Sequence, residues 1–154
     1  MTTVPERRQA TIAFCDLVGS TELAVRLDPE DMRQVLSVFR ATAGAAVAKH
    51  EGVIAQYLGD GILLFFGYPH AHEDAPERAA RAALEIVEKV SALEALPGVR
   101  LQVRMGIATG LVVIGDVLGD GAARDQAVSG STTHLAARIE TLAKPGTVYV
   151  SDST

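Results

Sequence analysis

The stretch VIAQYLGDGILLFF, residues 53–66, gives the clearest indication of the fold. Two strand-like runs, 53–58 and 61–66, are separated only by Gly59 and Asp60. A two-residue connection that contains glycine is typical of a tight antiparallel hairpin. We therefore expect a β-hairpin at this place, with a carboxylate in its turn.

The residues before this hairpin predict a buried strand and a helix. Residues 10–17 (ATIAFCDL) form a nearly continuous apolar run, as expected of a strand that is buried on both faces. A helix is then expected from Asp28 and Pro29, because aspartate suits the N-cap and proline suits the first helical position. Apolar residues follow at helical spacing until Gly52 ends the run.

The residues after the hairpin predict a second long helix and more strands. We expect Asp74-Ala-Pro-Glu77 to form a capping box for an alanine-rich helix that ends before Pro97. Strict alternation of apolar residues predicts a half-buried strand at 99–107, and Gly110 is expected to turn the chain into a second one. The remaining elements are predicted as a strand at 111–117, a Gly-rich loop at 118–126, a short strand, a helix at 131–143 and a strand at 147–151.

This order of elements predicts an α+β fold. It contains the series β-α-β-β-α-β, from which we expect a ferredoxin-like core: an antiparallel-rich sheet with the helices on one face. The chain has 154 residues, enough to bury one proper core, and shows no linker or internal repeat. We therefore expect a single domain, 1–154.

The composition excludes several classes of protein. Hydrophobic residues make up 48% and charged residues 21% of the chain, which excludes a disordered chain. The net charge of −5 disfavours general binding to nucleic acid. No apolar run is long enough to span a membrane, and the N-terminal residues lack the apolar core of a signal peptide. A single cysteine fits a reducing compartment, so we expect a cytoplasmic protein.

Two aspartates are the first candidates for chemistry. Asp16 ends one apolar strand and Asp60 interrupts the hairpin, and an unpaired carboxylate is costly in such places. If these strands are neighbours, the two carboxylates converge, and hard oxygen ligands of this kind suit Mg²⁺ or Mn²⁺. The alternative is purely structural: Asp60 serves a Gly-Asp-Gly turn, and Asp16 caps the turn that follows it.

The residues directly after Asp16 offer a second candidate. Gly19, Ser20 and Thr21 are small and stand at the start of a short helical segment, where backbone N–H groups can hold phosphate oxygens. The GKS or GKT of a Walker motif is absent, and the same residues also suit an ordinary helix cap.

Four segments together resemble the class III adenylate/guanylate cyclase catalytic domain. They are FCDLVGSTEL (14–23), YLGDGILLFFGYP (57–69), RMGIATG (104–110) and SGSTTHLAARIE (129–140). Their order is that of the family, and the resemblance covers nearly the whole chain. The stretch GYPHAHED is similar to a bacterial subgroup in which this domain often precedes a large ATPase and helical-repeat region.

The resemblance implies a β-α-β-β-α-β core, a head-to-tail homodimer with active sites shared between subunits, and two Mg²⁺ or Mn²⁺ ions. It implies that Asp16, Leu17 and Asp60 bind the metal ions and that Arg104 meets the pyrophosphate end of a nucleoside triphosphate. The backbone of Val18, Gly19, Ser20 and Thr21 is implied to lie beside the phosphates. Arg138, from the opposite subunit, is implied to stabilise the transition state.

Three positions depart from the pattern of the best-studied members. Gln56 stands where adenylate cyclases carry an adenine-selecting lysine, and Ala127 stands where its partner is expected. Glutamine both donates and accepts hydrogen bonds, so it can read adenine, although less sharply. His134 replaces the asparagine that orients the ribose, one helical turn before Arg138. We expect low turnover as a result.

The resemblance implies conversion of ATP to 3′,5′-cyclic AMP and pyrophosphate. Two alternatives stay open: a degenerate cyclase-homology module used for dimerisation or nucleotide sensing, and a guanylate cyclase. Family members continue past the strand matched by residues 147–151 and supply a lysine there. We therefore expect this domain to lack its C-terminal strands and to belong to a longer multidomain protein.

Overall fold

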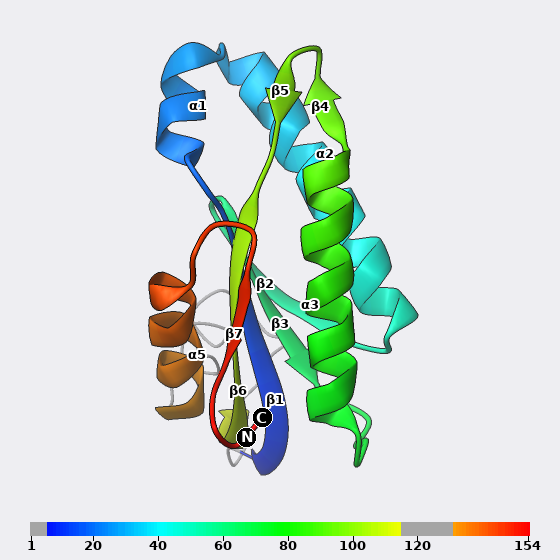
Figure 1. The fold of residues 1–154 in the computed structure, drawn as a ribbon. Coiled ribbons are helices and arrows are strands. Elements are labelled where there is room, and N and C mark those ends of the chain that lie inside the picture. The colour runs from blue at the N-terminus through cyan, green and yellow to red at the C-terminus, as the bar shows by residue number, and fades with distance from the viewer. Residues whose placement is uncertain (1–5, 115–130) are drawn as a thin grey trace, which may run out of the picture.

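The computed structural model describes residues 6–114 and 131–154, and it confirms the α+β class (Figure 1). The elements in chain order are β1 Glu6–Leu17, α1 Ser20–Arg26, α2 Pro29–Lys49, β2 Val53–Leu58, β3 Gly61–Phe66, α3 Ala75–Ala92, β4 Glu94–Leu96, β5 Val99–Arg100, β6 Val103–Ile114, α5 Ser131–Leu142 and β7 Val148–Val150. None of the helices in these two ranges is long and apolar enough to cross a membrane.

Five strands form the main sheet, in the order β2-β3-β1-β6-β7. All neighbours are antiparallel except β6 and β7, which are parallel. The predicted hairpin is confirmed as β2 and β3, and Gly59 in its turn has a φ of 64°, a conformation that glycine adopts without strain. The strand predicted at 10–17 is the central strand β1, which begins earlier than expected, at Glu6.

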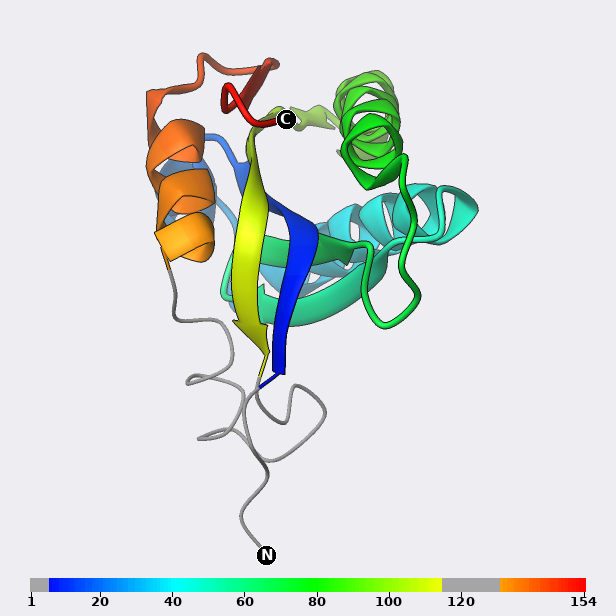
Figure 2. The ribbon, with the colours of Figure 1, turned by 90° about the horizontal axis from the view of Figure 1, so that it is seen from below.

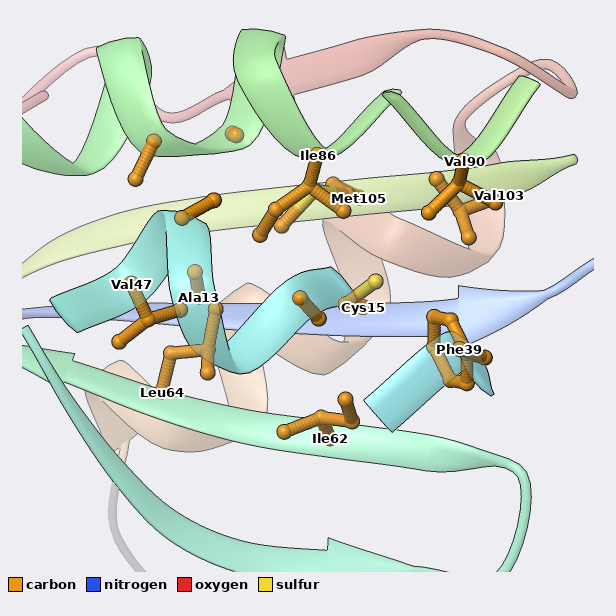
Figure 3. Packing of buried hydrophobic residues seen from close by; sticks show 14 of the residues in the cluster. Ala13, Cys15, Phe39, Val47, Ile62, Leu64, Ile86, Val90, Val103 and Met105 are labelled. Carbon is orange, nitrogen blue, oxygen red and sulfur yellow. The ribbon is translucent and has the colours of Figure 1, made fainter. Parts of the chain in front are cut away.

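Helices α2 and α3 cover one face of this sheet. Alternate residues of β1, β3 and β6 point toward them, among them Cys15, Ile62 and Met105. Figure 3 shows these side chains packed against Phe39 of α2 and Ile86 of α3. All five are buried to at least 99%. This apolar layer is the larger part of the core.

Helix α5 packs against the opposite face, where the sequence predicted all helices on one face (Figure 2). Ala136 of α5 is buried together with Ile12, Leu63 and Ala108, which alternate with the residues that face α2 and α3. The strands are apolar on both sides here, so each face needs a covering layer. Alternation in the strands alone does not say which helix covers which face.

The prediction of a turn at Gly110 is wrong, because β6 continues through it to Ile114. The whole of β6 pairs with β1, and Gly110 lies opposite Ala10 in that ladder. Pairing with the long strand β1 therefore keeps the backbone extended at Gly110, where the sequence predicted a turn. The rest of the strand predicted at 111–117, the loop at 118–126 and the short strand after it lie outside the described residues.

The two predicted helix starts had different outcomes. At α2, Asp28 is the N-cap as expected, and its carboxylate accepts a 2.8 Å hydrogen bond from the backbone N–H of Asp31. At α3, Asp74 is the N-cap residue but makes no capping hydrogen bond, so the capping box is wrong. Its carboxylate instead accepts a 2.8 Å hydrogen bond from Nε of Arg78, one turn further on.

Helix α3 ends at Ala92, which is before Pro97 as predicted. Residues 94–96 and 99–100 form a small two-stranded ribbon, β4 and β5, with Gly98 at a φ of 78° between them. The helix predicted at 131–143 and the strand predicted at 147–151 are confirmed as α5 and β7, with small differences at their ends.

Candidate active site

The candidate site lies on the sheet face that α5 covers, where β1 ends beside its two neighbours. Asp16 of β1 stands opposite Gly61 of β3 on one side and opposite Arg104 of β6 on the other. Asp60 precedes Gly61 in the hairpin turn, so the hairpin places the second carboxylate beside the first. The structure thus brings together the two aspartates that the sequence predicted to converge.

Gly61 leaves room for the carboxylate of Asp16. A Cβ atom at position 61 would lie 3.1 Å from Oδ1 of Asp16 and 3.3 Å from the backbone oxygen of Cys15. Both contacts are tighter than is usual for a side chain. The glycine that follows the hairpin turn therefore sets the space in which Asp16 lies.

Asp60 is held on both its side chain and its backbone. The hydroxyl of Ser20, at the start of α1, donates a hydrogen bond to Oδ2 of Asp60. The N–H of Leu17 donates to the backbone oxygen of Asp60 at 3.3 Å. The turn is thus tied to the end of β1 and to α1, and the carboxylate of Asp60 lies directly beside the predicted phosphate-binding segment.

The charges around Asp16 disfavour its ionisation when no cation is present. Partial burial raises the pKa of Asp16 to about 7, and the nearby carboxylates of Asp60 and Glu140 add to this effect. Arg104 acts in the opposite direction and lowers that pKa. Two carboxylates this close repel each other, and a bound cation would relieve the repulsion.

A cavity of about 240 Å³ opens beside these carboxylates. It is lined by Phe14, Cys15, Asp16, Leu58, Asp60, Gly61, Ala137, Glu140 and Thr141. Strand β1 and the hairpin of β2 and β3 supply one wall, and α5 supplies the other. The cavity is thus formed within one chain, between the sheet and the helix on its second face.

Arg104 and Glu140 form an ion pair at the edge of this site. Nε of Arg104 lies 3.1 Å from Oε1 of Glu140, and the Glu140 side chain is only 10% exposed. Burial raises the pKa of Glu140, while Arg104 opposes the rise. Sequence reasoning did not assign a role to Glu140, although it closes the AARIE segment, two residues after Arg138.

The two catalytic residues predicted on α5 are not among the residues that line this cavity. His134 and Arg138 are both exposed and stand one helical turn apart. Neither lines the cavity beside Asp16. Among the described residues, the cavity is therefore lined by Asp16 and Asp60 but by neither His134 nor Arg138.

The other predicted substrate-binding residues have different positions. Gln56 is partly buried in β2, next to an irregularity in the pairing with β3. Gly19 precedes α1 with a φ of 71°, and Thr21 in the first turn is exposed. The N–H of Val18 donates to the backbone oxygen of Gln102 at 2.9 Å. Ala127 lies outside the described residues.

Arg40 is a further residue that sequence reasoning missed. Its Nη2 donates a 2.8 Å hydrogen bond to the backbone oxygen of Gly59, and its guanidinium lies 4.6 Å from the ring centre of Tyr57. Arg40 thus fixes the hairpin that carries Asp60 to helix α2. A lone arginine in an amphipathic helix gives no sequence signal for such a contact.

This fold is that of a nucleotidyl cyclase catalytic domain of class III. The family of adenylate and guanylate cyclase catalytic domains matches residues 3–154. The chain belongs to that family.

Individual relatives agree with this assignment. The chain is 37% identical over 150 residues to an uncharacterised protein of Rhizobium meliloti. The matched residues cover 97% of this chain and 14% of that protein. It is 32% identical over 145 residues to an adenylate cyclase of Streptomyces coelicolor, covering 93% of this chain and 32% of that protein. The crystal structure of the guanylyl cyclase Cya2 superposes with a TM-score of 0.84 at 30% identity, covering 98% of this chain and 77% of that one.

The chain therefore spans a minor part of these two sequence relatives. The cyclase family implies divalent metal ions, and the residues present fit them. Asp16 and Asp60 offer hard carboxylate oxygens, and their mutual repulsion is the kind that a divalent cation relieves. In the described ranges, no group of three or more histidine, cysteine, aspartate or glutamate residues is arranged to hold a metal ion.

Proposed function

We propose that this chain is an adenylate cyclase domain that converts ATP to 3′,5′-cyclic AMP and pyrophosphate. The observation that carries the proposal is that Asp16, at the end of β1, lies beside Asp60 of the neighbouring hairpin turn and beside Arg104 of β6. The proposal includes a cytoplasmic location, which the buried free thiol of Cys15 supports.

The reaction forms one P–O bond and breaks another. The ribose 3′-oxygen attacks the α-phosphorus, and the bond from that phosphorus to the oxygen that bridges it to the β-phosphate breaks. Pyrophosphate leaves with the electron pair of that bond, and the proton of the hydroxyl passes to solvent water. Two divalent ions held by Asp16, Asp60 and Leu17 would supply charge neutralisation and a lowered pKa for the 3′-hydroxyl.

The other residues of the chain have positioning and charge-stabilising roles in this proposal. Arg104, beside the carboxylates, binds the pyrophosphate end, and the backbone from Val18 to Thr21 lies by the phosphates. Arg138 provides a planar set of N–H donors for the oxygens on which charge accumulates. His134 donates one hydrogen bond to the ribose through an imidazole ring, which is larger than the asparagine amide that it replaces.

The proposal requires a head-to-tail homodimer. His134 and Arg138 are exposed on α5 and lie outside the cavity of their own chain, which supports their action in a second copy. The site would then combine Asp16 and Asp60 of one subunit with Arg138 of the other.

The choice of ATP over GTP rests on position 56 and on one relative. Gln56 both donates and accepts hydrogen bonds, which suits adenine, whereas guanylate cyclases use glutamate at this position. The Streptomyces relative is named an adenylate cyclase, while Cya2 is a guanylyl cyclase. A direct comparison of Mn²⁺-ATP and Mn²⁺-GTP as substrates decides between the two.

The test is a cyclase assay on the chain with these two substrates. We expect cyclic AMP from Mn²⁺-ATP and loss of product by at least about a hundredfold in Asp16→Ala and Asp60→Ala, since each removes a metal ligand. Asp152→Ala is the matched control, because it removes an exposed carboxylate near the C-terminus. Equal activity in all four proteins would contradict the proposal.

A second candidate is a cyclase-homology module that senses nucleotide without turning it over. The observation that favours it is His134, exposed at the position of the ribose-orienting asparagine. Such a module binds Mn²⁺-ATP in calorimetry but releases no pyrophosphate. If the chain is a cyclase, the His134→Asn variant should cyclise ATP faster than the natural chain.

A further inference from the structure

Glu140 is a buried acidic residue that has no role in the proposed reaction. Only 8% of the residue is exposed, and it lies on the inner side of α5, whereas Arg138, two positions earlier, is exposed. Its one ion pair in the described ranges is with Arg104. A carboxylate is costly to bury, so this placement calls for a role.

Close packing of α5 on β6 puts Glu140 over Arg104. Arg104 and Gly106 are two positions apart in β6, so they point to the same face of the sheet. A Cβ atom at position 106 would lie 2.5 Å from the backbone oxygen of Ala136 and 2.7 Å from Cα of Glu140. Only glycine lets the helix backbone approach so closely, and this approach brings the Glu140 carboxylate to Arg104.

The atoms that form the ion pair leave most of the guanidinium for another ligand. Oε1 of Glu140 lies 3.1 Å from Nε of Arg104, one of the three nitrogens of the group. The two terminal amino groups carry four further N–H donors, arranged as a fork that matches phosphate oxygens. The Arg104 side chain is 36% exposed, so part of it faces solvent.

We propose that Glu140 is a positioning residue that holds Arg104 in the orientation in which it binds the pyrophosphate end of the substrate. The buried carboxylate fixes a long, flexible side chain before the ligand arrives, so less rotamer freedom is lost on binding. This inference rests on the proposed function, because it takes Arg104 as the pyrophosphate-binding residue.

Three other roles for Glu140 make different predictions. A third metal ligand would affect Mn²⁺ affinity with or without Arg104. A purely structural ion pair would lower stability without changing ligand preference. A competitor of phosphate for Arg104 would weaken binding, so its removal would tighten it.

The experiment is a double-mutant cycle measured by binding as well as by activity. Glu140→Gln, Arg104→Ala and the double variant of the full chain are titrated with inorganic pyrophosphate in the presence of Mn²⁺, by calorimetry. We expect Glu140→Gln to weaken pyrophosphate binding about tenfold, and by less than about twofold when Arg104 is already alanine. Cyclic AMP has no pyrophosphate group, so its affinity should not change.

Two controls separate positioning from folding. Thermal melting of each variant checks that it is folded, and Glu140→Asp, which keeps the charge, should restore part of the lost affinity. If Glu140→Gln does not fold, the same cycle is run with Glu140→Asp, which should then weaken pyrophosphate binding by a smaller factor that again depends on Arg104.

Several outcomes would overturn the proposal. They are an equal loss with and without Arg104, tighter or unchanged pyrophosphate binding, an equal loss of cyclic AMP binding, and no pyrophosphate binding by the natural chain. Failure of the proposed function is seen separately, as absence of turnover with both ATP and GTP, while the pyrophosphate titrations still measure the link between Glu140 and Arg104.

Discussion

The two faces of the central sheet differ in what the same strands present to them. On the face covered by α2 and α3, Cys15 is buried among apolar side chains, and burial raises the pKa of its thiol far above the usual range. On the face covered by α5, its neighbour Asp16 lies among charged groups. Because neighbouring residues of a strand point to opposite faces, Cys15 lies in the apolar core and Asp16 lies in the candidate active site.

Both faces bury apolar side chains, but they fill their space in different ways. The first face fills its space with large apolar side chains such as Phe39. The second face admits glycines, Gly61 and Gly106, wherever a carboxylate or a helix backbone must come close. Substitutions on the two faces should therefore fail in different ways.

The largest expected effect is on the apolar face. Phe39 is fully buried, so Phe39→Ala should lower the free energy of unfolding by about 3–5 kcal/mol through lost burial and a cavity. Urea unfolding measures this loss. Leu84→Ala, at a side chain that is 61% exposed on α3, is the control and should change stability by less than about 0.5 kcal/mol. Similar losses at both positions would mean that this layer is not the main core.

Adding one methyl group should change the free energy of unfolding in opposite directions on the two faces of the sheet. Gly106→Ala forces a Cβ to within 2.2 Å of the backbone nitrogen of Glu140, so α5 must shift, at about 1–3 kcal/mol of stability and with weaker binding of pyrophosphate. Gly44→Ala, in α2, meets only Ile54 at 3.6 Å and should stabilise by about 0.4–1 kcal/mol. Urea unfolding of both variants tests this, and a stabilising Gly106→Ala would contradict it.

The charged face should make stability depend on pH. Because the pKa of Asp16 is raised to about 7, the folded chain keeps a proton that the unfolded chain loses, so the metal-free protein should lose stability as pH rises from about 4 to 7. Asp16→Asn should then be more stable than the natural chain by about 1–2 kcal/mol at pH 8, a value reduced for solvent screening, and hardly different at pH 4.

Thermal melts without metal across this pH range measure the effect. Asp152→Asn, at an exposed position, is the control and should follow the natural chain at every pH. A natural chain that grows more stable between pH 4 and 7, with Asp16→Asn reducing that gain, would reverse the sign and contradict the argument.

The smallest expected effect concerns the contact between Arg40 of α2 and the hairpin turn that carries Asp60. Arg40→Met keeps the apolar stem but removes the hydrogen bond to Gly59 and the contact with Tyr57, for about 1 kcal/mol of stability. Because the same turn carries Asp60, Mn²⁺ affinity measured by calorimetry should also fall. Arg81→Met, which breaks an exposed pair with Glu77, is the control and should leave Mn²⁺ affinity unchanged.

Local rules were sufficient where a few neighbouring residues decide the structure. The hairpin at 53–66 and the cap at Asp28 follow from such short-range preferences, and both are confirmed. The same kind of rule failed at Asp74, because Arg78 one turn away takes its carboxylate. It failed again at Gly110, where pairing with β1 outweighs the tendency of glycine to turn.

The site was predictable only in part for a related reason. Asp16 and Asp60 stand out because carboxylates are rare in apolar strands, and the structure brings them together. Glu140 and Arg40 act through contacts with residues 36 and 19 positions away in the chain, at Arg104 and Gly59. No local pattern reports contacts of that kind. The roles of these residues in catalysis stay predictions.

The contact between α5 and Gly106 places main chain directly on main chain, with no side chain between the two. A side chain at such a junction can change rotamer and let the helix settle in several positions, whereas two backbones in contact have no such freedom. The separation of β6 and α5 at this point is therefore set by van der Waals contact between the two backbones. Helix α5, held in this way, presents Glu140 to the sheet and Arg138 to solvent.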